Sequence, residues 1–273
     1  MVEKDFDLKD IERSIIKKYR PKLWGKFCKA VVDYDLIQNG DKIAVCISGG
    51  KDSMILAKLM QEFQRHGHLE FELEFLAMNP GFNEENLSNM EYNCKMLGIP
   101  VKIFNTQIFE VSQSLAENPC YLCARMRRGA LYSEAQALGC NKIALGHHFN
   151  DVIETTLLNV LYSGNYRTMM PKLKAANYEG MELIRPMYLI EEQNIIAWRN
   201  FTGLKYMDCG CVVTEKNLPS KRREVKELIK NLKLTFKDVD KSIFRSASNV
   251  SVEAILGWNK DGKQHSFLDE YEK

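Results

Sequence analysis

The sequence predicts an α/β fold in which helices cover both faces of a mostly parallel, five-stranded sheet, with extra helices at both ends of the chain. Short apolar runs of strand length alternate with longer segments of helical periodicity, and this alternation requires crossover connections between parallel strands. A loop with two adjacent glycines follows the first apolar run directly. Such a loop is expected where a buried strand passes sharply into a helix.

The length and composition fit a globular enzyme or binding protein. The chain has 273 residues, of which 45% are hydrophobic and 27% charged, and this is enough for one α/β domain with appended helices. No apolar run approaches the roughly 20 residues that cross a bilayer. The N-terminal residues are polar and lack the apolar core of a signal peptide. We therefore expect a cytoplasmic protein with no membrane partner.

The elements follow in a regular order along the chain. Residues 7–38 have helical spacing, which Pro21 interrupts. The expected strands cover residues 42–47, 71–78, 101–104, 142–145 and 181–185. The expected helices cover residues 52–64, 84–97, 123–138, 150–162, 191–201, 220–232 and 239–247, and the last 25 or so residues are weakly patterned. We divide the chain into an N-terminal helical segment (1–40), a nucleotide-binding domain (41–190), a C-terminal helical extension (191–250) and a tail (251–273).

The loop after the first strand has the composition of a phosphate-binding site. It reads Ser48-Gly49-Gly50-Lys51-Asp52-Ser53. The glycines let the backbone approach a ligand, the amides at the start of a helix favour an anion, and Lys51 and Ser53 add a charge and a hydroxyl. The longer spacing of the common G-x-x-x-x-G-K-[ST] loop is absent.

This loop resembles the S-G-G-x-D-S signature of the PP-loop, or N-type ATP pyrophosphatase, superfamily, which has a Rossmann-like fold. The resemblance implies that ATP is cleaved between its α- and β-phosphates, with magnesium, and that AMP is transferred to an oxygen of the substrate. Lys51 and Asp52 would be the catalytic residues, Lys51 by neutralising charge and Asp52 by placing the metal or the phosphates. The implied phosphate-binding residues are Ser48, Gly49, Gly50 and Ser53.

A second segment, at the start of the helix after the fourth strand, completes the expected ATP site. It resembles the G-H-H-x-D-D-x-x-E-T motif of the same superfamily, in which the glycine and the second acid contact the nucleotide and its metal. By this resemblance Gly146 and Asp151 bind ATP, whereas Asn150 stands where many relatives have the first aspartate. Met78 and Asn79, at the end of the second strand, are expected to contact the base or ribose.

Four of the 8 cysteines are paired in the sequence. Cys120 and Cys123 form C-x-x-C, and Cys209 and Cys211 form C-x-C. Disulfides are rare in the cytosol, so such pairs indicate metal or redox chemistry. A four-thiolate zinc site and a three-thiolate iron–sulfur cluster with one open iron both fit these residues.

The pattern C-x-L-C-x-R-x-R-R-G, together with the glycine loop, the G-H-H segment and a late cysteine, resembles the tRNA 2-thiocytidine synthetase family over nearly the whole chain. This resemblance implies a [4Fe-4S] cluster held by Cys120, Cys123 and Cys209, with Cys211 as the alternative third ligand, because many relatives have C-x-x-C where this chain has C-x-C. It implies adenylation of a pyrimidine C2 oxygen in tRNA, followed by sulfur transfer, with 2-thiocytidine as the product. A cysteine desulfurase or other sulfur donor would supply the sulfur, and relatives are often homodimers.

Basic clusters at residues 17–29 and 216–230 are expected to hold tRNA phosphates. The alternative function is an ATP-dependent PP-loop enzyme with a structural zinc site that acts on another RNA base or on a small molecule. A non-catalytic RNA-binding protein with a vestigial nucleotide fold is a further alternative, and the complete glycine loop argues against it.

Overall fold

A computed structural model describes residues 7–106, 108, 119–206 and 221–271. The chain forms two compact units, one of Met1–Val152 with Met170–Pro219 and the other of Ile153–Met169 with Ser220–Lys273. Our division into four segments stays a prediction. Within the described ranges, no helix has the length and apolar character needed to span a membrane.

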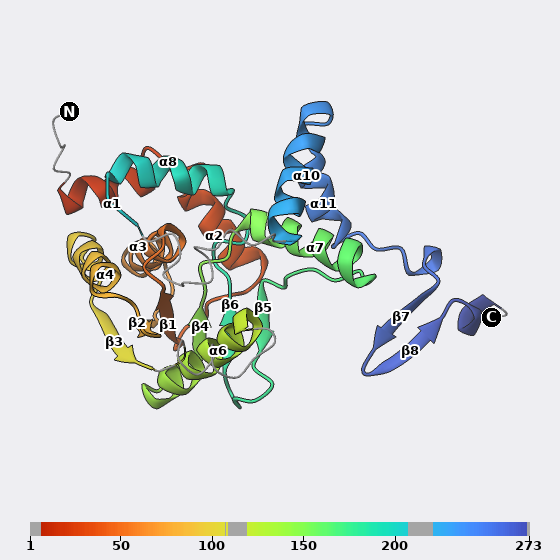
Figure 1. Cartoon of the computed structure of the whole chain (residues 1–273), viewed down its shortest axis with the longest axis horizontal. Helices are drawn as coiled ribbons and strands as arrows, with labels where there is room; N and C mark the ends of the chain where they lie inside the picture. The colour runs from red at the N-terminus through yellow and green to blue at the C-terminus, as the bar shows by residue number, and fades with distance from the viewer. Residues whose placement is uncertain (1–6, 107, 109–118, 207–220, 272–273) are drawn as a thin grey trace. The chain divides into compact units, whose positions relative to one another are not determined.

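The first unit is built on one six-stranded sheet with the order β3-β2-β1-β4-β6-β5 (Figure 1). All neighbouring strands are parallel except β5, which is antiparallel to β6. The mostly parallel α/β fold is thus confirmed, with an added edge strand that the sequence did not indicate. The strands are β1 (Lys42–Ile47), β2 (Glu72–Asn79), β3 (Val101–Asn105), β4 (Lys142–Ala144), β5 (Lys172–Lys174) and β6 (Glu182–Ile184).

Helices cover both faces of this sheet. Figure 1 shows α1, α3 and α8 on one side and α6 on the other. The alternation of side chains along β1 accounts for the two layers: Ile43 and Val45 pack in the larger core with α3, whereas Cys46 packs in the core with α6. The helices are α1 (Leu8–Ile16), α2 (Trp24–Asp33), α3 (Lys51–His66), α4 (Glu84–Met96), α6 (Pro119–Ala137), α7 (Phe149–Ser163) and α8 (Glu192–Thr202).

The strand order places the connections after β1 and β4 next to each other. From β1 the chain continues outward to β2 and β3, and it then returns to add β4 on the other side of β1. Ligands in open α/β sheets bind at the carboxyl ends of the strands, at the point where the order reverses. Here that point lies between β1 and β4, where the glycine loop and the G-H-H segment both begin.

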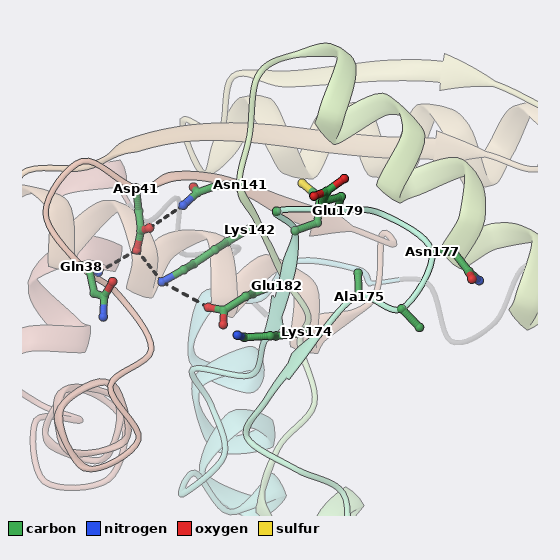
Figure 2. A pocket seen from close by; sticks show the side chains of 12 residues that line it. Gln38, Asp41, Asn141, Lys142, Lys174, Ala175, Asn177, Glu179 and Glu182 are labelled. Carbon is green, nitrogen blue, oxygen red and sulfur yellow. Dashed lines mark hydrogen bonds and ion pairs between the residues drawn. The ribbon is translucent and has the colours of Figure 1, made fainter. Parts of the chain in front are cut away.

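The amino ends of the same strands carry a buried ion pair (Figure 2). Lys142 Nζ lies 2.7 Å from Asp41 Oδ2 and donates to the Leu36 carbonyl at 3.0 Å. Asn141 Nδ2 donates to Asp41 Oδ1 at 2.7 Å, and Glu182 lies 3.7 Å from Lys142. These side chains line a pocket of about 730 Å³ and fulfil one another's hydrogen bonds. The amino ends of the strands therefore carry a polar network that is structural in character.

The second unit is helical apart from one hairpin. Strands β7 and β8 pair in antiparallel register around Asp261 and Gly262, which both have positive φ. Two such residues form a type I′ turn, and Asp-Gly is a preferred sequence for it. Besides most of α7, the elements are α10 (Lys221–Thr235), α11 (Val239–Ser246), the 3-10 turn Val252–Ala254, β7 (Gly257–Lys260), β8 (Lys263–Ser266) and α12 (Leu268–Tyr271).

Candidate active site

A pocket of about 590 Å³ lies at the carboxyl ends of the strands in the first unit. Its walls come from the ends of β1, β2, β4 and β6 and from α6. Of the predicted ATP-binding residues, the lining includes Ser48, Asp52, Ser53, Met78, Gly146 and Asp151. It does not include Gly49, Gly50, Lys51 or Asn79. The two sequence motifs therefore meet in one cavity.

The glycine loop is held in shape by its two serines. Ser53 Oγ accepts from the backbone N–H of Ser48 at 3.1 Å and donates to the Gly50 carbonyl at 2.9 Å. Gly49 has φ of +82°, a conformation that glycine adopts without strain. The loop is thus preorganised before a ligand arrives, and α3 begins at its end with amides that favour an anion.

Lys51 is engaged in ion pairs in this structure. Its Nζ lies 2.9 Å from Asp52 Oδ2 and 3.4 Å from Glu192 Oε1, at the start of α8. Because both partners are carboxylates, a phosphate that binds to the loop must compete with them for the ammonium group. Sequence reasoning identified Lys51 and missed Glu192, which lies far along the chain in no recognised motif.

The loop after β4 approaches the glycine loop closely at Gly146. A Cβ at this position would lie 3.1 Å from the carbonyl carbon and oxygen of Asp52 and 3.2 Å from the amide of Ser53. A side chain here would therefore push the two loops apart. Further along the same segment, Asp151 Oδ2 accepts from the backbone N–H of His148 at 3.0 Å and so closes the first turn of α7.

Two buried polar atoms beside the pocket lack a hydrogen-bond partner among the residues that the structure describes. They are Asp52 Oδ1 and His148 Nδ1. The imidazole of His148 lies between two carboxylates, with Nδ1 3.4 Å from Asp151 Oδ2 and Nε2 3.8 Å from Asp52 Oδ1. A buried carboxylate oxygen without a donor costs free energy unless a ligand satisfies it. Magnesium bound to nucleotide phosphates prefers such oxygens, so the residues present fit an ATP–magnesium complex.

Two asparagines of the predicted site have local structural roles. Asn150 Oδ1 accepts from the backbone N–H of Glu192 at 2.9 Å and so satisfies an amide at the start of α8. Asn79 Oδ1 accepts from the backbone N–H groups of Gly81 and Phe82 at 3.1 and 2.8 Å. Asn150 therefore connects the start of α7 to the start of α8.

Three arginines line the pocket: Arg127 and Arg128 from α6, and Arg185 just after β6. The side chains of Arg127 and Arg128 make no hydrogen bond or ion pair within the described ranges. Arg185 is 7% exposed, and burial lowers the pKa of its guanidinium. The sequence did not predict a site role for Arg185, because this residue lies outside the motifs. The sequence indicated only the apolar strand beside it.

The cysteines fall into two groups. Cys46 lines the pocket, but burial raises the pKa of its thiol to about 12, so it is protonated at neutral pH and is a poor nucleophile. Cys120 and Cys123 fall in the first turns of α6. The positions of their thiols, and Cys209 and Cys211 altogether, lie outside the described residues.

Comparison with known proteins decides the family. A model of the PP-loop domain matches residues 21–210. The tRNA-cytidine(32) 2-sulfurtransferase of Pelobacter propionicus is 35% identical over 237 residues, which cover 86% of this chain and 87% of that protein. The enzyme of the same name from Syntrophotalea carbinolica is 36% identical over 249 residues, or 90% and 94% of the two chains. The chain belongs to the tRNA 2-thiocytidine synthetase family of PP-loop proteins.

The fold of this PP-loop protein is also found in a solved structure. The U34-tRNA thiolase NcsA from Methanococcus maripaludis, with its [4Fe-4S] cluster, aligns with a TM-score of 0.66 and 24% identity, covering 86% of this chain and 80% of that one. The family and the sheet architecture indicated by the sequence motifs are therefore confirmed. The assignment of individual residues to ATP and to the cluster stays a prediction.

Proposed function

We propose that this protein is an ATP-dependent tRNA sulfurtransferase that converts a cytidine of tRNA to 2-thiocytidine. Two relatives at 35% and 36% identity carry the name tRNA-cytidine(32) 2-sulfurtransferase, and each is covered over most of its length. Position 32 is therefore the target we propose here too. Bases in a single-stranded loop can leave their stack and enter a pocket at low cost.

One structural observation supports sulfur transfer rather than adenylation alone. Helix α6 begins with the Cys120–Cys123 segment and continues to Arg127 and Arg128, which line the ATP pocket. Cys123 precedes Arg127 by four residues, which corresponds to about 6 Å along a helix axis. The helix that carries two proposed cluster ligands thus continues into the wall of the proposed adenylation pocket, and this supports a reaction in which both serve one base.

The chemistry proceeds in two balanced steps. The C2 oxygen of the base attacks the α-phosphorus of ATP, and pyrophosphate leaves, which converts an unreactive carbonyl into an adenylate. A sulfide then adds its electron pair to C2, and AMP leaves with the former carbonyl oxygen and the electrons of the C2–O bond. The glycine loop holds phosphate, while Asp52 and Asp151 face the site where magnesium would neutralise charge.

Three thiolates with one open iron match the donor set of a [4Fe-4S] cluster that exchanges a ligand. We assign the thiolates to Cys120, Cys123 and Cys209, with Cys211 as the alternative to Cys209. A cluster bound there would supply the sulfur at its fourth iron. A cysteine desulfurase would recharge it with persulfide sulfur, which two electrons from a thiol reductant convert to sulfide, or another donor would supply sulfide directly. We place the enzyme in the cytoplasm as a homodimer.

The N-terminal basic cluster provides the better candidate surface for tRNA phosphates. Exposed side chains without an ion-pair partner in the described ranges are found at Lys17, Arg20, Lys22 and Lys26. On α10, by contrast, Lys230 pairs with Glu227 at 3.4 Å and Arg222 pairs with the buried Glu154 at 3.1 Å. Cations already paired have less to gain from RNA.

Replacing these four exposed cations with alanine should weaken tRNA binding and reduce its salt dependence by about one unit of slope for each phosphate that is no longer neutralised. Lys29→Ala is the matched control, since Lys29 is also exposed on α2 but pairs with Asp33 at 2.7 Å. Equal effects of the two changes would contradict this surface. Binding is measured by titration of unmodified tRNA at several salt concentrations.

The decisive experiment combines spectroscopy with product analysis. The full chain, purified anaerobically, should show the broad visible absorbance of an iron–sulfur protein and bind about four irons. With ATP, tRNA and a sulfur source it should release pyrophosphate and yield 2-thiocytidine by mass spectrometry of digested nucleosides. Cys123→Ala should lose the absorbance and the product, whereas Cys140→Ala, at a buried cysteine outside the motif, should keep both. A colourless, zinc-loaded protein would refute the cluster.

A further inference from the structure

Arg185 makes a specific contact with the first histidine of the G-H-H segment. Its Nε donates to Nδ1 of His147 at 3.3 Å, and its Nη1 donates to the carbonyl oxygen of Met170. The backbone is fixed as well, because the N–H of Arg185 donates to the Pro171 carbonyl at 2.9 Å. The guanidinium is thus a buried, fixed group with one N–H directed at an imidazole nitrogen.

This contact determines the protonation pattern of the imidazole. A guanidinium remains protonated in proteins and has only donors, so it cannot accept a hydrogen bond. The ring nitrogen that faces Arg185 must therefore present a lone pair. In a neutral imidazole the hydrogen is then on the other nitrogen, so His147 is the Nε2–H tautomer.

His148, the next residue, has the opposite surroundings. It faces the carboxylates of Asp151 and Asp52, which accept hydrogen bonds, and it is buried. Of the two histidines only His147 lines the pocket. The motif thus places His148 among acids inside the protein and His147 beside a cation in the wall of the pocket.

We propose that Arg185 is a positioning residue that holds His147 as the Nε2–H tautomer, so that His147 donates a hydrogen bond to an oxygen of the α-phosphate under attack. This inference rests on the adenylation proposed above. Negative charge on that phosphate increases as the base oxygen adds and pyrophosphate departs. A preorganised neutral donor stabilises such charge without giving up its proton.

The first test measures the tautomer without any turnover. The full chain is labelled with ¹⁵N-histidine, and its 5 histidines are distinguished by single substitutions. His147 should show the shift pattern of an Nε2–H, Nδ1-lone-pair ring. In Arg185→Met the pattern should change to a mixture of tautomers, while the exposed His68 should not change. A wild-type His147 with its hydrogen on Nδ1 would overturn the proposal, whether or not the enzyme thiolates tRNA.

The second test compares two amides at position 147. The amide nitrogen of glutamine can occupy the place of Nε2, whereas that of asparagine reaches only the place of Nδ1. Pyrophosphate release with ATP and tRNA should therefore stay within about tenfold of wild type in His147→Gln and fall about 10²–10³-fold in His147→Asn. Thermal melting confirms that both variants fold. Equal activities would overturn the donor role, while an unchanged Nε2–H pattern in Arg185→Met would overturn the role of Arg185.

A matched pair of substitutions separates positioning from packing. Arg185→Lys keeps a donor and a charge, and Arg185→Met keeps only the apolar stem. If Arg185 acts through His147, the lysine variant should restore part of kcat and of the Nε2–H pattern relative to methionine. If the two variants have the same kcat and the same tautomer pattern, the residue has a packing role only and the proposal fails.

Discussion

The two ends of the parallel sheet carry pockets of similar size that differ in how fully their buried polar groups are hydrogen-bonded. At the amino ends, around Asp41 and Lys142, each buried charge has close partners (Figure 2). At the carboxyl ends, Asp52 Oδ1 and His148 Nδ1 are buried without a hydrogen bond to any described residue. Unsatisfied polar atoms, rather than volume, therefore distinguish a site prepared for a ligand from a structural network.

The largest effect is expected at the amino ends, and on stability alone. Lys142→Met leaves the carboxylate of Asp41 buried and without its cation, so the free energy of unfolding should fall by about 3–5 kcal/mol. Adding Asp41→Asn removes the charge and keeps an oxygen acceptor. The double variant should therefore be more stable than Lys142→Met alone.

Urea denaturation measures both variants of this network, and pyrophosphate release per folded molecule should stay at the wild-type level. If Lys142→Met abolished activity without loss of stability, the amino-end pocket would be functional and the comparison would fail.

At the carboxyl ends the expected pattern is reversed. Asp52→Asn removes a carboxylate that faces the pocket and pairs with Lys51, so the rate of pyrophosphate release should fall about 10²–10³-fold. The melting temperature should stay unchanged or rise, because active sites retain groups at the expense of stability. Glu182→Gln, at the amino-end network, is the control and should leave the rate unchanged. A rate for Asp52→Asn near that of wild type would contradict the assignment.

The stability of the protein at alkaline pH should report on a buried thiol at each end of the sheet. Burial raises the pKa of Cys46, at the carboxyl end of β1, to about 12, and that of Cys140, before β4, to about 11, from 9.0. The folded state thus keeps protons that the unfolded state loses above pH 9. The two thiols therefore contribute their full stabilisation below pH 9. The free energy of unfolding should fall by on the order of a few kcal/mol as pH rises from 9 to 12.

Denaturant titrations at several pH values measure this loss, and Cys46→Ala and Cys140→Ala should each make the decline shallower. The same decline in both variants as in wild type would show that other groups cause it.

The smallest effect concerns Asn150. Asn150→Asp keeps an oxygen that accepts from the Glu192 amide, so stability and rate should change little. Asn150→Ala removes the acceptor and should lower the free energy of unfolding by about 1 kcal/mol. A gain in rate of tenfold or more in Asn150→Asp would instead show that a second carboxylate serves catalysis. Thermal melts and steady-state kinetics check the series.

Local patterns revealed the sheet and half of the site. The run Lys42–Ile47 with its glycine loop was predicted because a buried strand and a tight turn leave compositional marks. Strand β5 was missed because Lys172–Lys174 is short, largely exposed and at an edge. The hairpin around Asp261-Gly262 was also missed, although that dipeptide is a turn signal, because its flanking strands have little apolar alternation.

The remaining site residues could not be predicted from local sequence, because only the tertiary fold brings them to the pocket. Arg185 resembles any arginine after an apolar segment until β6 is placed beside β4, which brings it to His147. Glu192 becomes relevant only when α8 begins beside the glycine loop. Such pairings depend on strand order, and a sequence window contains no information on strand order.

Because Lys51 pairs with Glu192, an anion that binds to the glycine loop must displace this carboxylate to reach the lysine. An anion gains the lysine only if it outcompetes a carboxylate held at 3.4 Å, so ligands that carry a polyphosphate have an advantage over nucleosides and monophosphates. Once pyrophosphate has gone, the same carboxylate can recapture the ammonium group and return the loop to its resting state. In the proposed reaction this ion pair would compete with the nucleotide for Lys51, and it would therefore favour polyphosphate ligands over spent nucleotide.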